Sequence, residues 1–170
     1  LYFSTVLRYF SLEENIKAYE SGIKVKREYF RLKPIKSANG TSTLQPVPLG
    51  SNVKIGEKIL CRLTLDCRNE YHYVVIEDPR PAGWESVEQL SDDNMYGDYS
   101  PDGWIPWTKY EFRDEKTAIF ATRLPEGKWV AEYFMRAEVP GQFHSLPALA
   151  YAMYVPQLNG NGSEQRINIK

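Results

Sequence analysis

The sequence has few of the residues that most often carry metal or nucleophilic chemistry, with two cysteines and two histidines among 170 residues. Neither the histidines nor the cysteines have the close spacing of a zinc site. The chain also lacks an excess of charge, because 21 basic and 22 acidic residues leave a net charge of −1. This balance gives no indication of binding to nucleic acid or to an anionic membrane surface.

Long apolar runs are missing as well, and none approaches the roughly 20 residues that a membrane-spanning helix needs. The chain begins with Leu1 rather than methionine. Its first ten residues alternate like a strand and lack the basic head and cleavage site of a signal peptide. We therefore expect a segment cut from a longer protein, with the length of one domain.

The two cysteines, Cys61 and Cys67, lie in one expected strand over residues 58–67. At about 3.3 Å per residue, that strand would place them roughly 20 Å apart. A disulfide requires Cα atoms within about 7 Å of each other. We expect two free thiols. Cys61 alternates in step with Ile59, Leu63 and Leu65, which indicates a small core residue.

What the sequence has in abundance is aromatic residues, at 14% with 12 tyrosines, and apolar–polar alternation. Both are typical of β-strands. Turn signals at 114–116 and 124–127 separate the runs, with Pro125 and Gly127 suited to a turn. The pattern predicts an all-β, antiparallel Ig-like or fibronectin-III-like sandwich of about seven to eight strands with at most short helices. The strands are expected at 2–10, 23–32, 59–66, 72–78, 108–113, 117–122, 129–139 and 166–169.

Only one segment has a helix signal. Ser11-Leu12-Glu13-Glu14 resembles a capping box and would open a helical turn or two over 14–20, stopped by Gly22. Two other segments are expected to be loops. Ser37–Gly50 is rich in Ser, Thr, Pro and Gly, and Pro79–Pro106 is longer than an ordinary connection.

Candidate catalytic and metal sites have weak support. His144 precedes Ser145, but adjacent residues of an extended chain point to opposite faces, and His72 lies in a strand pattern. A packed or exposed histidine is therefore the better interpretation of each. The acidic segment 91–102 has oxygen ligands of the kind that calcium prefers but lacks the EF-hand spacing, so a solvated loop is favoured and calcium binding stays open.

An aromatic cluster around the long loop supports a different class of function. Packing into the core is the common role of such residues. Exposed rings could instead stack on sugars, and a carbohydrate-binding or adhesion module is the alternative prediction. The residues concerned are Trp84, Tyr96, Tyr99, Trp104 and Trp107.

Several short motifs, in one order, resemble the C-terminal domain of bacterial alpha-2-macroglobulins. The resemblance starts at Gly22–Arg27 and covers essentially the whole chain. Arg80 and Val155 depart from the family pattern, which has an apolar and an acidic residue there. The motifs are Asp78–Glu85 (Asp-x-x-Pro-Ala-Gly-aromatic-Glu), Glu111–Asp114 (Glu-x-Arg-Asp), Leu124–Gly127 (Leu-Pro-x-Gly), Tyr133–Ala137, Pro140–Phe143 (Pro-Gly-x-Phe) and Ala152–Pro156 (Ala-Met-Tyr-x-Pro).

The resemblance implies a single macroglobulin-like sandwich over residues 1–170, with a strand and linker or short helix at 1–21 and a long aromatic and acidic loop at 79–106. It implies a non-enzymatic domain of a trap-type protease inhibitor, without a cofactor, that covers a thioester in a neighbouring domain. Met153 and Tyr154 are implied to shield that thioester from water; ordinary core residues are the other interpretation of this pair.

The resemblance also implies partners and a location. The partners are other domains of the same parent chain, above all the thioester domain, and indirectly proteases. Membrane contact would come only through a lipid anchor of the parent. The implied location is the periplasm, the cell envelope or the exterior of a bacterium. The thioester motif Cys-x-x-Gln does not occur at Cys61 or Cys67.

Overall fold

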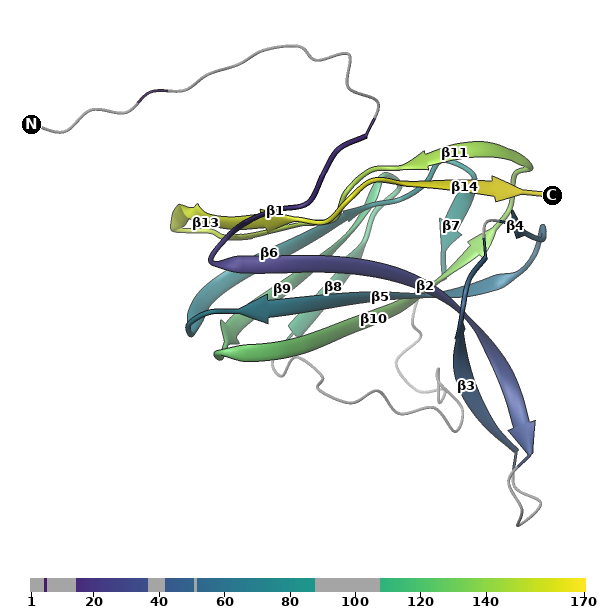
Figure 1. The fold of residues 1–170 in the computed structure, drawn as a ribbon, viewed down its shortest axis with the longest axis horizontal. Helices are drawn as coiled ribbons and strands as arrows, with labels where there is room; N and C mark the ends of the chain where they lie inside the picture. The colour runs from purple at the N-terminus through teal and green to yellow at the C-terminus, as the bar shows by residue number, and fades with distance from the viewer. Residues whose placement is uncertain (1–4, 6–14, 37–41, 51, 88–107) are drawn as a thin grey trace, which may run out of the picture.

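Fourteen β-strands and no helices form the regular structure in the residues that the computed structural model describes, which are 5, 15–36, 42–50, 52–87 and 108–170 (Figure 1). The expected all-β class is confirmed. The strands are more numerous than expected, because short ones lie between the long ones. They are β1 (Tyr19–Ser21), β2 (Ile23–Lys36), β3 (Ser42–Pro48), β4 (Asn52–Val53), β5 (Lys58–Cys67), β6 (Tyr71–Pro79), β7 (Trp84–Ser86), β8 (Thr108–Phe112), β9 (Lys116–Leu124), β10 (Gly127–Ala137), β11 (Gly141–Ser145), β12 (Leu149–Ala152), β13 (Val155–Asn161) and β14 (Gln165–Ile169).

Two antiparallel sheets form the layers of the sandwich. One has the strand order β1-β13-β12-β6-β9-β8 and the other β3-β2-β5-β10-β7. A third sheet, β11-β14-β4, lies along the upper side of the view in Figure 1 and contains the parallel pair of β14 and β4. None of the described segments forms an apolar helix of membrane-spanning length.

The core lies between the two large sheets and follows the predicted alternation. On β5, every second residue is buried from Ile59 to Cys67, and Arg62 and Thr64 lie on the other face. β10 pairs with β5 over ten positions and contributes a matching row. The buried side chains that these two rows place in the core include Ile59, Cys61, Leu63, Leu65, Ala131, Tyr133, Met135 and Ala137.

Both predicted turns connect strands, but only one of them forms a hairpin within a sheet. The turn at 114–116 joins β8 to β9, neighbours in one sheet. The turn at 124–127 joins β9 to β10, which belong to different sheets. Gly127 has φ 115° and Gly141 has φ 148°, as expected for glycines that follow Pro125 and Pro140 in turns.

The expected helical segment near the N-terminus is wrong for the residues that the structure describes. Residues 15–18 have no regular structure, and Tyr19–Ser21 pair with Asn159–Asn161 of β13. The capping-box pattern is a local preference, and pairing with a distant strand outweighs it. The strand expected at 2–10 falls outside the described residues except at position 5.

Both expected loops contain strands that local sequence did not reveal. Ser42–Pro48 is β3 and pairs with the second half of β2. The prediction of a loop over 37–50 is therefore wrong for these seven residues. Pro46 and Pro48 are compatible with this strand because it lies at a sheet edge. Within 79–106, Trp84–Ser86 is β7 and pairs with the end of β10; residues 88–107 lie outside the described ranges.

β13 passes very close to β2 at Gly160. A Cβ atom at this position would lie 1.8 Å from the carbonyl oxygen of Ile23. Only a residue without a side chain allows this approach. The contact brings β13 and its preceding hairpin into a fixed position against the second sheet.

Candidate functional site

Met153 and Tyr154 form the two-residue loop of the hairpin between β12 and β13, in which Ala152 pairs with Val155. Such loops usually contain Asn, Asp or Gly, which suit the backbone of a tight turn. Just beyond the loop, the side-chain amide of Asn159 donates to the carbonyl of Pro156 at 2.7 Å. Turn chemistry alone therefore does not account for a methionine and a tyrosine at these two positions.

Four large exposed side chains gather at the β12–β13 hairpin: Tyr73, Met153, Tyr154 and Val155. We call these four residues the hairpin tip. Their exposed fractions are 49%, 50%, 75% and 45%. The N–H of Met153 donates to the carbonyl of Tyr73 at 2.9 Å. The rings of Tyr73 and Tyr154 meet edge to face, with centroids 5.4 Å apart and an angle of 87°. The pair that the resemblance singled out thus lies on the surface rather than in the core.

Tyr73 is the member of the tip that has no signal in the sequence. It falls within the expected strand 72–78 like any other aromatic residue. In the structure its φ is 54°, and no other non-glycine residue in the described ranges has a positive φ. A bulky side chain in this region is uncommon and marks local strain. Only the backbone geometry distinguishes it.

A buried polar network connects the three sheets near the C-terminal end of β6, where Asp78 lies. Arg27 of β2 donates from Nη1 to Oδ1 of Asp78 on β6 at 2.5 Å. Its Nη2 donates to the carbonyl of Ser145 on β11 at 2.9 Å. The side-chain amide of Gln165 on β14 donates to the Arg27 carbonyl at 3.1 Å. One arginine thus ties the two large sheets to the small one.

Four further side chains complete the network, and two of them donate to Asp78. The Tyr133 hydroxyl donates to Oδ2 of Asp78 at 2.6 Å, and the Cys61 thiol donates to the same oxygen at 3.3 Å. The hydroxyls of Tyr29 and Ser145 lie 2.7 Å apart and share a hydrogen bond. All members except the half-buried Gln165 are buried, and the hydrogen bonds to Asp78 satisfy its carboxylate.

The ionisable side chains of the network with shifted pKa values each have one protonation state at neutral pH. Burial raises the pKa of the Cys61 thiol and of the Tyr133 phenol, and the Asp78 carboxylate raises each further. Burial by itself would lower the pKa of the Arg27 guanidinium, but the Asp78 carboxylate raises it overall. The arginine therefore stays charged while the thiol and phenol stay protonated. Such groups stabilise a fold and supply no activated nucleophile.

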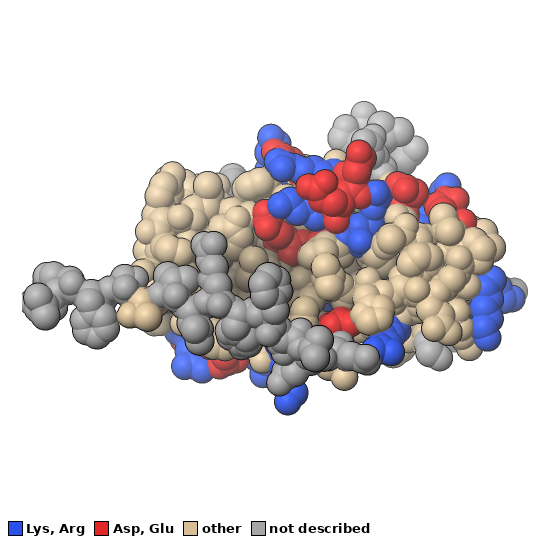
Figure 2. Space-filling model, turned by 90° about the horizontal axis from the view of Figure 1, so that it is seen from above, with Lys and Arg blue, Asp and Glu red and all other residues tan. Residues whose placement is uncertain are grey.

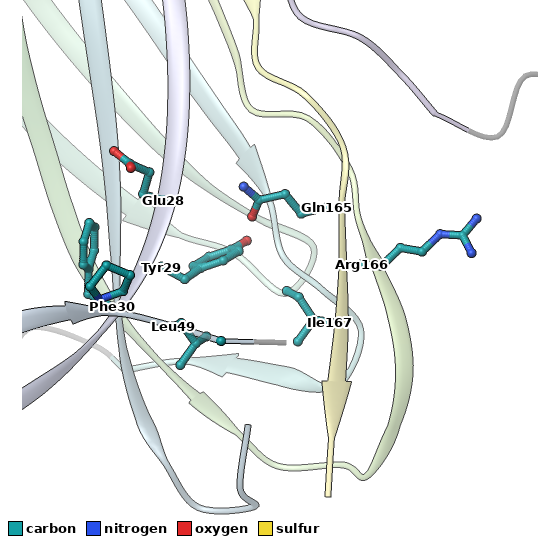
Figure 3. Close-up of a pocket in the computed structure, with 9 residues that line it drawn as sticks. Glu28, Tyr29, Phe30, Leu49, Gln165, Arg166 and Ile167 are labelled. Carbon is teal, nitrogen blue, oxygen red and sulfur yellow. The ribbon is translucent and has the colours of Figure 1, made fainter. Parts of the chain in front are cut away.

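One cavity, with a volume of about 390 Å³, opens between β2, the end of β3 and β14. Figure 3 shows the ring of Tyr29 and the side chain of Ile167 pointing into the space between the strands, while Glu28 and Arg166 point away from each other. The two charged groups do not converge on one point. The cavity therefore lacks the arrangement of an acid–base pair among its lining residues.

The histidines do not assemble a nucleophile–base pair in the described part of the chain. His144 Nδ1 lies 2.6 Å from Oε1 of Glu164, whereas the Ser145 hydroxyl points inward to Tyr29. The two neighbours thus face opposite ways, as expected. His72 is exposed and lies 3.2 Å from Glu70.

Two further sequence hypotheses fall largely outside the described residues. These are the acidic segment 91–102 and the aromatic residues Tyr96, Tyr99, Trp104 and Trp107. Trp84 is described, is fully buried and packs against the ring of Tyr29 at 4.9 Å, so it is not available to stack on a sugar. In the ranges that the structure covers, no three His, Cys, Asp or Glu side chains are placed to hold a metal ion.

Surface charge gives no single-signed patch on the face seen in Figure 2, where acidic and basic side chains are interspersed and separated by wide uncharged areas. This agrees with the net charge of −1.

The two antiparallel sheets packed around one core define a β-sandwich domain. The family described as the bacterial alpha-2-macroglobulin MG10 domain matches residues 22–157. This match covers most of the sequence, and the chain belongs to that family.

Solved structures of bacterial alpha-2-macroglobulins have the same fold. The native Escherichia coli protein from domain MG7 to the C-terminus aligns with a TM-score of 0.71 and 18% identity, over 90% of this chain and 24% of that chain. The Salmonella protein reacted with methylamine aligns with a TM-score of 0.68 and 22% identity, over 91% of this chain and 10% of that chain.

The chain is also similar to a short part of a much longer protein. Circularly permutated Ras protein 2 of Dictyostelium discoideum is 22% identical over 169 residues, which are 99% of this chain and 4% of that protein. The chain therefore spans only a small part of the proteins to which it is similar.

Proposed function

We propose that this chain is the C-terminal domain of a bacterial alpha-2-macroglobulin-like protease inhibitor, and that it packs against and shields the thioester-domain region of its parent. The observation that carries the proposal is the exposure of Met153 and Tyr154 at a protruding turn. Clusters of exposed apolar side chains mark surfaces that contact another molecule or domain. Family membership supports the thioester domain as that contact.

The chemistry of the two side chains suits a water-excluding contact. A thioether is flexible and fills irregular gaps. A tyrosine ring covers a large area and keeps a polar tip for the boundary of the contact. Covering a reactive acyl bond in this way slows its hydrolysis by keeping water away. The proposed domain acts through contact, is not an enzyme and needs no cofactor.

The proposed setting follows from the same membership. The direct partners are other domains of the parent chain, and proteases are met only through the whole inhibitor. We propose a periplasmic, cell-envelope or extracellular location in a bacterium, with any membrane contact made by a lipid anchor of the parent.

The test compares thioester lifetime in the full-length, thioester-bearing parent. The double variant Met153→Ala/Tyr154→Ala should release the thiol faster than the wild type when methylamine is added and when it is omitted. Removal of two large contacts opens a path for water without changing the reacting groups. Thiol release over time is the measurement.

A matched control removes two exposed apolar side chains elsewhere. Ile55 and Val139 have exposed fractions of 51% and 52%. Ile55 follows β4 and Val139 follows β10 in the sequence, and β4 lies at the other end of the sandwich from β13 (Figure 1). Ile55→Ala/Val139→Ala should leave the rate at the wild-type value. Equal rates for both double variants and the wild type would contradict shielding by Met153 and Tyr154.

A further inference from the structure

The backbone of Tyr73 is held in a conformation that a tyrosine disfavours. Its φ of 54° lies in the left-handed region, where the Cβ of an L-residue crowds its own backbone. The strand does not lose register there, because His72 pairs with Arg123 and Val74 pairs with Ala121 on either side. The strain is therefore local to one residue, and the surrounding sheet holds it in place.

This conformation changes what β6 presents to solvent. His72 and Tyr73 are both exposed, between the buried Tyr71 and Val74. Regular alternation would place one of two adjacent residues on each face. The left-handed residue breaks the alternation at the point where β6 meets the β12–β13 hairpin. The exposed ring of Tyr73 lies at this point, in contact with the ring of Tyr154.

Two contacts link Tyr73 to the residues of the proposed shield. Its carbonyl accepts the N–H of Met153 at 2.9 Å, just after the last β6–β12 pair of Val74 with Ala152. Its ring meets the ring of Tyr154 edge to face at 5.4 Å. Edge-to-face packing favours one orientation of the two rings. Tyr154 has an exposed fraction of 75%, so few other contacts restrict its ring.

We propose that Tyr73 is a positioning residue of the hairpin tip: its strained backbone and its ring hold Tyr154 in the orientation in which the tip contacts the apolar surface of a neighbouring domain of the parent. This inference rests on the proposed function. It extends that function from a two-residue hairpin loop to a surface built from two strands. The strain at Tyr73 then has a role, because a relaxed backbone would change the direction in which the ring leaves β6.

The first experiment follows the ring of Tyr154 by NMR in the 170-residue chain. Tyr73→Asn removes the ring but tolerates a positive φ, and Tyr73→Phe keeps the ring. Tyr73→Asn should move the Tyr154 ring resonances toward values of an unrestrained tyrosine, and Tyr73→Phe should leave them in place. Unchanged Tyr154 resonances in Tyr73→Asn would overturn the inference, whatever the parent does.

The second experiment measures thiol release in the thioester-bearing parent. Tyr73→Asn should release thiol about two- to tenfold faster than the wild type, the range that corresponds to one edge-to-face aromatic pair. Tyr73→Phe should restore the wild-type rate, and Tyr73→Asn should add little to Tyr154→Ala.

The outcomes separate the two proposals. A wild-type rate for Tyr73→Asn beside a fast Met153→Ala/Tyr154→Ala variant overturns the role of Tyr73 and leaves the shield intact. A wild-type rate for Met153→Ala/Tyr154→Ala overturns the shield itself, and with it the contact that Tyr73 is proposed to serve.

Discussion

Arg27 on β2 and Asp78 on β6 form an ion pair of 2.5 Å that is almost completely buried and joins the two large sheets. Such a pair is not by itself a source of stability, because removing two charges from water costs about as much as their attraction returns. Breaking it is a different matter, since one charge then stays buried without a partner. The first prediction follows from this asymmetry.

Asp78→Asn should lower the free energy of unfolding by about 3–5 kcal/mol. Denaturant unfolding of the 170-residue chain measures it. The control is Glu85→Gln, which removes the partner of Arg80 in a pair whose glutamate is exposed and should cost less than about 1 kcal/mol. A similar loss of unfolding free energy in both variants would show that the buried ion pair contributes no more to stability than the exposed one.

Gly160→Ala should destabilise the fold by about 3 kcal/mol or more, at the upper end of overpacking effects. The new Cβ would meet the carbonyl oxygen of Ile23, a backbone atom that cannot move without shifting β2. Gly50→Ala is the matched control, because a Cβ there meets nothing within 4 Å. Thermal unfolding of the two variants decides the prediction; a Gly160→Ala protein as stable as Gly50→Ala would contradict the close approach of β13 and β2.

Cys61 and Cys67 should both be recovered as thiols after denaturation without reductant. Both are free and buried in the structure. In the native protein at pH 8 neither should react readily with a thiol reagent, because burial raises the pKa of Cys67 to about 12 and that of Cys61 well above its usual range. Only the thiolate reacts. Rapid labelling of native protein, or no thiols after denaturation, would count against this arrangement.

Stability should fall steeply above about pH 10, the ordinary pKa of tyrosine. Burial raises the pKa of Tyr29 and Tyr133 in the fold, so the unfolded chain loses these protons first. The stabilisation is complete below the unfolded pKa and disappears as pH rises toward the folded one, by up to about 1.4 kcal/mol per pH unit for each tyrosine. Urea unfolding between pH 8 and 11 should show a shallower decline for Tyr133→Phe than for the wild type. Parallel slopes would rule out the contribution of Tyr133.

The 170-residue chain with Met153→Ala and Tyr154→Ala should unfold within about 1 kcal/mol of the wild type, as is usual for exposed positions. Both side chains are at least half exposed. A loss of several kcal/mol, typical of emptied core positions, would show that the pair supports the fold. The same denaturant experiment as for Asp78→Asn measures it.

Much of the long-strand framework could be predicted from alternation, because the face that a side chain occupies is a local property of an extended chain. The row Ile59, Cys61, Leu63 and Leu65 is buried as predicted. The motifs from Asp78 to Pro156 indicated the family that the comparison then established. Gly127 and Gly141 were expected in turns and have positive φ.

Alternation did not reveal β1, β3, β4, β7, β11, β12 or β13. Among these, β1, β3 and β7 are edge strands of the two large sheets, and their hydrogen bonds come from other parts of the chain: β13 for β1, β10 for β7, and β2 across the loop for β3. Local preferences in these segments favour a helix or a loop, and pairing outweighs them. The same dependence on a distant partner explains why Arg27 and Asp78 could not be paired from the sequence.

The sequence by itself determined the all-β class, the inward rows of the long strands and the resemblance to one family, because these depend on residue type and short-range order. Only the tertiary structure decided that Met153 and Tyr154 face solvent, since a hairpin loop exposes what a strand would bury. It also decided the left-handed backbone of Tyr73 and its contact with Tyr154, because that geometry exists only where β6 and the β12–β13 hairpin hold the residue from both sides.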